Sequence, residues 1–184
     1  MKLFSPKTGL SRPITDRVKE SLFSILYKYD LPNGKMVADL FCGVGSLGLE
    51  ALSRGAGFVT FVEKDPKVIA ILEKNIEKAG FVKKSKVIRA NAFKIGAPVN
   101  FDQQQYGLVF VDPPYARTRD VGADSPLSGL LTLLGEQVAT DGIVAVRTYK
   151  HTELLEQYGR LEIIDRRRWG TMAVTILQQS RDDE

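Results

Sequence analysis

The chain of 184 residues is 43% hydrophobic and 26% charged, which is typical of a single soluble globular domain. A single cysteine excludes an internal disulfide, and together with a single histidine it argues against a metal site. The sequence shows no signal peptide and no apolar run of membrane length, so we expect a cytoplasmic protein, and we expect it to be a monomer. The net charge of +4 favours an anionic partner such as a nucleic acid, although a merely soluble surface also explains it.

The N-terminal part is predicted to be a flexible segment followed by a helix. Residues 1–14 are polar and contain prolines, so we expect a loop. The helix is predicted over 15–29, because apolar residues recur there at helical spacing, at Val18, Leu22, Ile25, Leu26 and Tyr29.

Short apolar runs then alternate with helical stretches across a core of residues 35–178. Strands are predicted over 36–41, 58–63, 86–90, 108–112 and 142–147, and helices over 46–54, 65–79 and 126–138. Two further runs, 160–165 and 172–177, are joined by a short basic turn and suit an antiparallel pair. The pattern predicts one α/β domain, with a mostly parallel seven-stranded sheet, helices on both faces and an antiparallel C-terminal edge.

A glycine-rich loop, D-L-F-C-G-V-G-S-L-G, follows the first predicted strand. Gly43, Gly45 and Gly48 form G-x-G-x-x-G between a strand and a helix, which is typical of a nucleotide-type cofactor site. We count Phe41 among the cofactor-binding residues of this loop. Glu63 ends the second strand, where a carboxylate can bind ribose hydroxyls.

The carboxylate of Asp39 indicates which of two cofactor classes this loop would bind. A carboxylate there would repel the pyrophosphate of a dinucleotide, whereas S-adenosylmethionine has an ammonium and a sulfonium and no phosphate. We therefore predict S-adenosylmethionine, with Asp39 at the methionine end and Glu63 at the ribose; a capped turn is the alternative for Asp39. Asn91 and the backbone around Ala92 would lie near the adenine, although an Asx turn also explains Asn91.

The fourth strand ends at Asp112, Pro113, Pro114 and Tyr115. Ligands of open parallel sheets bind at the carboxyl ends of the strands, so this D-P-P-Y segment would face the sulfonium methyl. Asp112 and the Pro113 carbonyl could accept hydrogen bonds from the exocyclic amine of a nucleobase, and Tyr115 could stack on the base. The alternative is a simple turn.

Five segments together resemble the RsmD-type methyltransferases: R-P-I-T-D-R-V-K-E-S-L-F (12–23), D-L-F-C-G-V-G-S-L-G-L-E-A-L-S-R-G-A (39–56), F-V-E-K-D (61–65), V-F-V-D-P-P-Y (109–115) and R-R-W-G-T-M-A-V-T-I-L (167–177). The resemblance runs from about Leu10 to Leu177. It implies a Rossmann-like class I methyltransferase fold and methylation of the exocyclic N2 of a guanine in 16S ribosomal RNA.

The resemblance also implies roles for residues. Asp39, Gly43, Gly45 and Glu63 would bind S-adenosylmethionine, the D-P-P-Y segment would hold the target amine, and segment 12–23 would cover the site. Several arginines are candidates for contact with the RNA, or else for solvated surface charge: Arg12, Arg17, Arg117, Arg167 and Arg168. Arg12 and Arg17 could instead meet the cofactor carboxylate.

Three other functions stay open. An N6-adenine methyltransferase would use the same D-P-P-Y segment. Only ten residues separate Tyr115 from the helix at 126, which is too few for a region that reads a DNA sequence. This favours structured RNA or the small ribosomal subunit as the substrate. A nicotinamide oxidoreductase is disfavoured by Asp39. A non-catalytic binding module would leave the acid at Asp112 without a purpose.

Overall fold

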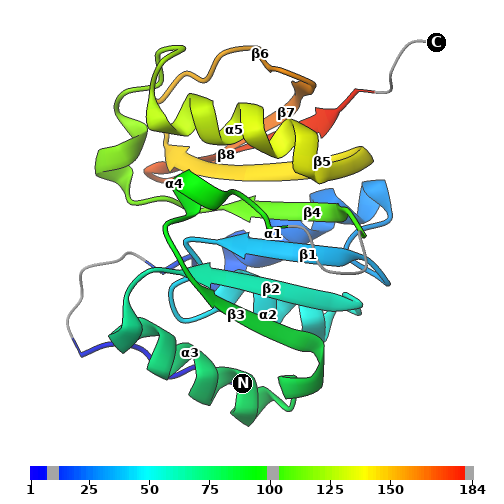
Figure 1. Cartoon of the computed structure of the whole chain (residues 1–184), viewed down its shortest axis with the longest axis vertical. Helices are drawn as coiled ribbons and strands as arrows, with labels where there is room; N and C mark the ends of the chain where they lie inside the picture. The colour runs from blue at the N-terminus through cyan, green and yellow to red at the C-terminus, as the bar shows by residue number, and fades with distance from the viewer. Residues whose placement is uncertain (8–12, 99–103, 181–184) are drawn as a thin grey trace.

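The computed structural model describes residues 1–7, 13–98 and 104–180. Within these ranges one eight-stranded sheet has the order β3-β2-β1-β4-β5-β8-β7-β6 (Figure 1). The strands are β1 (Met36–Leu40), β2 (Phe58–Glu63), β3 (Ser85–Arg89), β4 (Tyr106–Val111), β5 (Val138–Tyr149), β6 (Gln157–Tyr158), β7 (Leu161–Trp169) and β8 (Met172–Gln179). The α-helices are α1 (Asp16–Leu26), α2 (Ser46–Ser53), α3 (Pro66–Ala79), α4 (Ala92–Ile95) and α5 (Pro126–Gln137), and the 3-10 helices are η1 (Tyr27–Tyr29), η2 (Val82–Lys84) and η3 (Tyr115–Thr118).

Strands β1 to β5 are parallel, and β8 joins β5 in antiparallel pairing, followed by β7 and β6. This confirms the predicted α/β class with an antiparallel C-terminal edge. The two-residue strand β6 and the one-turn helix α4 were not predicted, because elements this short show no hydrophobic period. In the described ranges, no helix combines the length and apolarity needed to cross a bilayer.

One predicted turn is wrong. The arginines from Arg166 to Arg168 lie within β7 and pair with residues of β8, for example Arg167 with Val174, and the turn itself is formed by Gly170 and Thr171. Gly170 has φ +57, a conformation that favours glycine. The backbone ladder with β8 decides the conformation here, whatever the polarity of the side chains.

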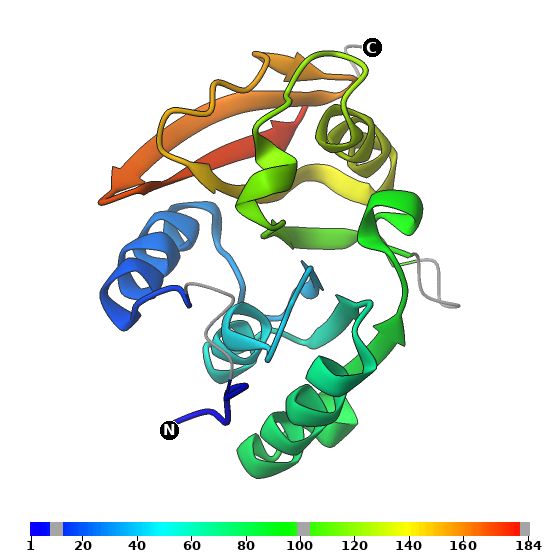
Figure 2. The ribbon, with the colours of Figure 1, turned by 90° about the vertical axis from the view of Figure 1, so that its left-hand side faces the viewer.

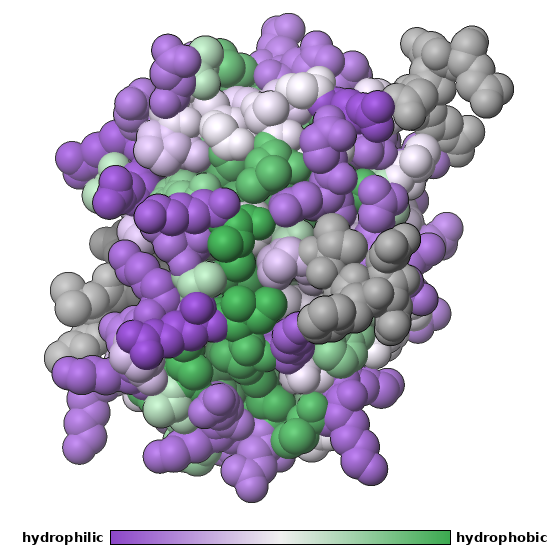
Figure 3. Space-filling view, viewed as in Figure 1, coloured by the Kyte–Doolittle hydropathy of each residue, from purple (hydrophilic) through white to green (hydrophobic). Residues whose placement is uncertain are grey.

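Helices cover both faces of the sheet, so the central strands are buried on both sides (Figures 1 and 2). In β4, Leu108 and Phe110 pack with α1, α2 and α3, whereas Val109 and Val111 pack with α5. Partly buried apolar side chains pack against the cluster on the second face, and Figure 3 shows a band of apolar surface down the middle of this view.

Asn75 on α3 fixes the glycine-rich loop and the N-terminal segment. This fully buried amide donates to Val44 O at 3.0 Å and to Phe4 O at 3.1 Å, and its Oδ1 accepts the Phe4 N–H at 2.8 Å. One side chain therefore ties residues 1–7 and the loop after β1 to the same helix.

Candidate active site

The carboxyl ends of the parallel strands meet at one edge of the sheet, which faces the viewer in Figure 2. Helix α1 and the β7–β8 hairpin lie on one side of this edge and α4 lies on the other. Asp39 on β1, Glu63 on β2 and Asp112 after β4 all lie here, because β1 pairs with both β2 and β4. The Asp112 N–H donates to Leu40 O at 3.3 Å, which extends the β1–β4 ladder to the D-P-P-Y segment.

The loop after β1 turns through three left-handed residues. Phe41 has φ +57, Gly43 +54 and Gly45 +92. Left-handed backbone at a phenylalanine is strained, and such strain is concentrated at binding sites. The Phe41 ring is held against Phe93, with the ring centroids 4.7 Å apart. A Cβ atom at Gly43 would meet nothing within 4 Å, so this part of the loop borders open space.

Glu63 reaches across to the glycine loop. Its Oε2 accepts the Gly43 N–H at 3.1 Å, while Oε1 accepts the N–H groups of Lys64 and Asp65 at 2.8 and 3.0 Å. The carboxylate is thus held beside the open space at Gly43.

Asp39 is buried under the loop. Its Oδ2 accepts the Gly48 N–H at 2.8 Å, which is the capping interaction named above as its structural alternative. The pKa of Asp39 is raised to about 8, chiefly by burial and to a smaller extent by the neighbouring Asp112 and Glu63, while the Gly48 N–H and Arg147 oppose the rise. The three acids therefore share one electrostatic environment.

Asn91 takes its local alternative too. Its Oδ1 accepts the Phe93 N–H at 3.1 Å and so caps α4, of which the buried Ala92 is the first residue. The Asn91 side chain is therefore engaged in a local cap.

Asp112 forms an ion pair that was not predicted. Its Oδ1 lies 2.6 Å from Arg147 Nε, because Val111 pairs with Val146 and the next residue of each strand follows in register. Burial raises the pKa of Asp112, and Arg147 opposes that rise. The signal in the sequence was a cation directly after the buried run of β5, at the same edge as Asp112.

The two prolines and Tyr115 complete the segment. Pro113 is buried and Pro114 exposed, and the half-buried Tyr115 ring lies 6.0 Å from the Arg147 guanidinium. The Tyr115 hydroxyl is buried and has no hydrogen-bond partner in the described part of the chain.

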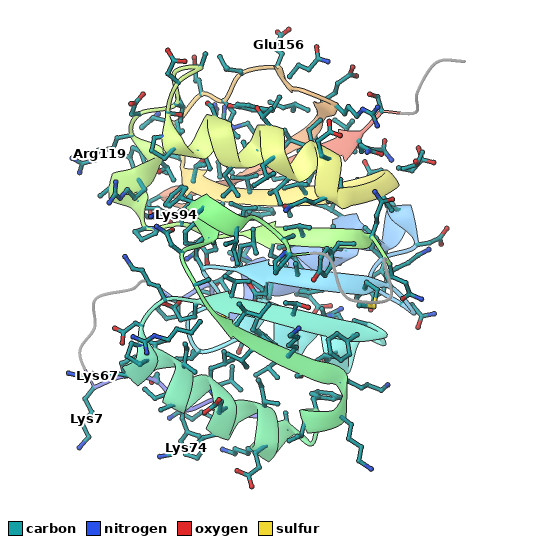
Figure 4. All side chains as sticks on the ribbon, viewed as in Figure 1. Lys7, Lys67, Lys74, Lys94, Arg119 and Glu156 are labelled. Carbon is teal, nitrogen blue, oxygen red and sulfur yellow. The ribbon has the colours of Figure 1, made fainter. Side chains whose placement is uncertain are left out.

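The predicted RNA-contacting arginines are spread over several elements. Arg12 lies outside the described residues. Arg17 on α1, Arg117 on η3, and Arg167 and Arg168 on β7 are all exposed. Figure 4 shows Arg119 and Lys67 projecting from the side on which the parallel strands end. Arg167 is ion-paired with Asp165 at 3.1 Å, whereas Arg117 belongs to η3, which begins at Tyr115 of the D-P-P-Y segment.

A family model described as "Conserved hypothetical protein 95" matches residues 1–178. The chain is 32% identical over 171 residues to "Putative rRNA methyltransferase YlbH" of Bacillus subtilis, an alignment that covers 92% of this chain and 88% of that protein. It is 40% identical over 122 residues to "Ribosomal RNA small subunit methyltransferase D" of Escherichia coli K12, covering 63% of this chain and 56% of that protein. The chain belongs to the RsmD-type methyltransferase family.

The RsmD-type fold is also found in solved structures. "Putative methyltransferase yhhF" from Escherichia coli superposes with a TM-score of 0.80 at 27% identity, over 99% of this chain and 93% of that one. A class I methyltransferase fold is thereby confirmed, and membership of this methyltransferase family confirms the predicted cofactor, S-adenosylmethionine.

The residues present fit this cofactor of the RsmD-type enzymes. Three acidic side chains and one guanidinium line this edge, and carboxyl oxygens suit an ammonium and a sulfonium and disfavour a pyrophosphate. No cluster of metal-binding side chains occurs among residues 1–7, 13–98 and 104–180.

Proposed function

We propose that the protein methylates the exocyclic N2 amine of a guanine in 16S ribosomal RNA. The observation that carries this proposal is the position of Asp112, a carboxylate held by Arg147 at the carboxyl end of β4, directly across the switch point from the glycine loop. An acceptor for an amine and a loop for the cofactor thus lie at the same edge of the sheet.

For the cofactor, Glu63 would bind the ribose hydroxyls beside Gly43, and the Ala92 backbone would read the adenine. Asp39 would accept a hydrogen bond from the methionine ammonium, whose positive charge would favour the ionised carboxylate. Phe41 and Gly45 shape the loop. S-adenosylmethionine supplies a methyl group made electrophilic by its sulfonium.

For the target base, Asp112 and the Pro113 carbonyl would accept the two N–H groups of the amine. Arg147 binds Asp112 Oδ1, and among the described residues none donates to Oδ2, which would accept one N–H of the amine. Two acceptors would orient the nitrogen lone pair toward the methyl group, and positioning of this kind supplies much of the catalysis. Asp112 can hold the proton that the nitrogen loses, and Tyr115 would stack on the base, which must be unpaired or flipped out.

Ribosomal RNA as the substrate is supported by the relatives, two of which are named as ribosomal RNA methyltransferases. Exposed Arg17, Arg117 and Arg168 offer contacts to phosphate. Short connections around the site favour a substrate recognised by its shape, such as folded RNA or an assembled small subunit.

The test is incubation with labelled S-adenosylmethionine and either undermethylated 16S ribosomal RNA or small subunits, followed by nucleoside digestion and mass spectrometry. We expect N2-methylguanosine from one of the two substrates and none with Asp112→Ala. N6-methyladenosine would establish the second candidate, an adenine methyltransferase, since the D-P-P-Y segment suits either amine.

A further inference from the structure

A row of aromatic rings leads outward from the target site along the end of β5. The ring centroids of Tyr115 and Tyr149 are 6.5 Å apart, and those of Tyr149 and His151 are 5.3 Å apart, both pairs packing edge to face. Alternate residues of a strand project to the same side, so Tyr149 lies on the side of β5 from which Arg147 contacts Asp112. The row therefore starts at the proposed amine site and continues away from it.

Solvent exposure increases along this row. Tyr115 is half-buried, Tyr149 is 40% exposed and His151 is exposed. An exposed aromatic ring next to a site for one base can stack on another, because proteins hold unpaired nucleotides mainly by stacking. We propose that Tyr149, with His151 beside it, forms a second base-binding site for an unpaired nucleotide adjoining the target; this rests on the proposed methylation of RNA.

Tyr149 and His151, here called the platform, lie on a stretch of backbone that hydrogen bonds hold in place. The Lys150 N–H donates to Thr171 O at 2.9 Å, the Thr152 N–H donates to Tyr149 O at 3.0 Å, and Arg166 Nη2 donates to the carbonyls of Lys150 and Thr152. A ring held in place before binding loses little conformational freedom when a base stacks on it.

Cations flank the platform on two sides. Thr152 Oγ1 donates to Thr118 O at 3.3 Å and so joins the turn to η3, which carries the exposed Arg117. On the other side, Met172 of β8 pairs with Tyr149 of β5 and with Trp169 of β7. The exposed Arg168, which precedes Trp169 on β7, therefore lies two strands away from Tyr149. Glu153 is the acid of this turn, and its charge acts on Arg166. A nucleotide on Tyr149 would thus have guanidinium groups within reach for its phosphates.

Substitutions at Tyr149 test this site. Tyr149→Ala and Tyr149→Leu remove the aromatic ring, and Leu keeps apolar bulk should Ala disturb the fold, whereas Tyr149→Phe keeps the ring. Tyr27→Ala is the matched control, because Tyr27 is 51% exposed and lies on η1, outside the row. The measurements are the Kd for undermethylated 16S ribosomal RNA and for small subunits, the Kd for S-adenosylmethionine, and the Tm.

We expect Ala and Leu at Tyr149 to weaken RNA binding about 10-fold, the loss of one stacked base, with an unchanged cofactor Kd. Phe and the Tyr27 control should bind RNA as the wild type does. Wild-type RNA affinity in Tyr149→Leu, or an equal loss in Tyr27→Ala, would overturn the inference. So would a loss seen with subunits but not with RNA alone, which would assign the platform to a ribosomal protein.

Failure of the proposed function would look different. In that case the wild-type protein would transfer no methyl group to RNA or subunits, and both proposals would fall together. If the wild type methylates RNA and Tyr149→Leu does so with unchanged Kd and KM, only the second base-binding site is refuted.

Discussion

Arg147 Nε lies 2.6 Å from Asp112 Oδ1, so the acid of the D-P-P-Y segment is held by a cation from the adjacent strand. The side chains of Arg147 and Asp112 are only 12% and 18% exposed. Burial alone would favour the neutral carboxylic acid, and the guanidinium counteracts this. The ion pair therefore limits the rise in the pKa of this buried carboxyl group.

Replacing Arg147 with Met should therefore shift the pH dependence of methyl transfer. Without the cation the pKa of Asp112 rises further, so the carboxylate forms only at higher pH and the rising limb of the rate profile moves upward. We also expect a loss of about 1–3 kcal/mol in the free energy of unfolding, because a buried acid loses its partner. Rates measured from pH 5 to 9 check this, with Arg147→Lys as the control that keeps a cation; a Met variant with the wild-type profile would refute the role.

Asp39 should make the protein less stable at high pH. The folded pKa is about 8, above the ordinary value of 3.8, so the folded state holds a proton that the unfolded state has lost between these values. The raised pKa of Asp39 contributes about 2–5 kcal/mol to the free energy of unfolding below pH 4. This contribution is lost as the pH rises through 8. Urea unfolding at pH 5, 7 and 9 should show this decline in the wild type and a flatter dependence in Asp39→Asn, which keeps an acceptor for Gly48. Parallel curves would contradict the raised pKa.

Two glycines of the loop should respond differently to alanine. A Cβ at Gly48 would lie 2.3 Å from Phe61 Cε1, so Gly48→Ala should lower the free energy of unfolding by about 1–3 kcal/mol. A Cβ at Gly43 meets nothing, and the left-handed backbone there costs about 1 kcal/mol, so Gly43→Ala should mainly weaken binding of S-adenosylmethionine at the space it enters. Thermal melting and calorimetry separate the two effects. Equal cofactor affinity in Gly43→Ala and the wild type would move the cofactor away from this loop.

Tyr115 should act through its ring and not its hydroxyl. The hydroxyl is buried without a partner in the described residues, so Tyr115→Phe should keep the stability, or raise it by up to about 1 kcal/mol, and keep methyl transfer. Tyr115→Leu removes the stacking surface and should raise the KM for RNA. A large drop in kcat for the Phe variant would instead show that the hydroxyl contacts the substrate.

The elements that carry the site were predictable because their signals are local. The apolar run of β4 ends at Asp112, the glycines directly follow β1, and Glu63 ends β2 at the expected place. Each signal lies within a few residues, and parallel strands bring their carboxyl ends to one edge without further information.

The partners across the sheet were not predictable. Arg147 is 35 residues from Asp112, and their contact depends on the register of β4 with β5. Asn75 joins Phe4 over 71 residues. The predicted basic turn was wrong because pairing with β8 continues the strand through Arg168, which local polarity does not reveal.

The sequence by itself determined the α/β class, the glycine-rich loop and the D-P-P-Y segment, since hydrophobic period and turn chemistry act between neighbours along the chain. Only the tertiary structure decided which cation holds Asp112, that Asp39 and Asn91 also cap helices, and that Tyr149 extends the row of rings from Tyr115. These contacts depend on strand register and packing, which place side chains from distant segments within a few ångströms of one another.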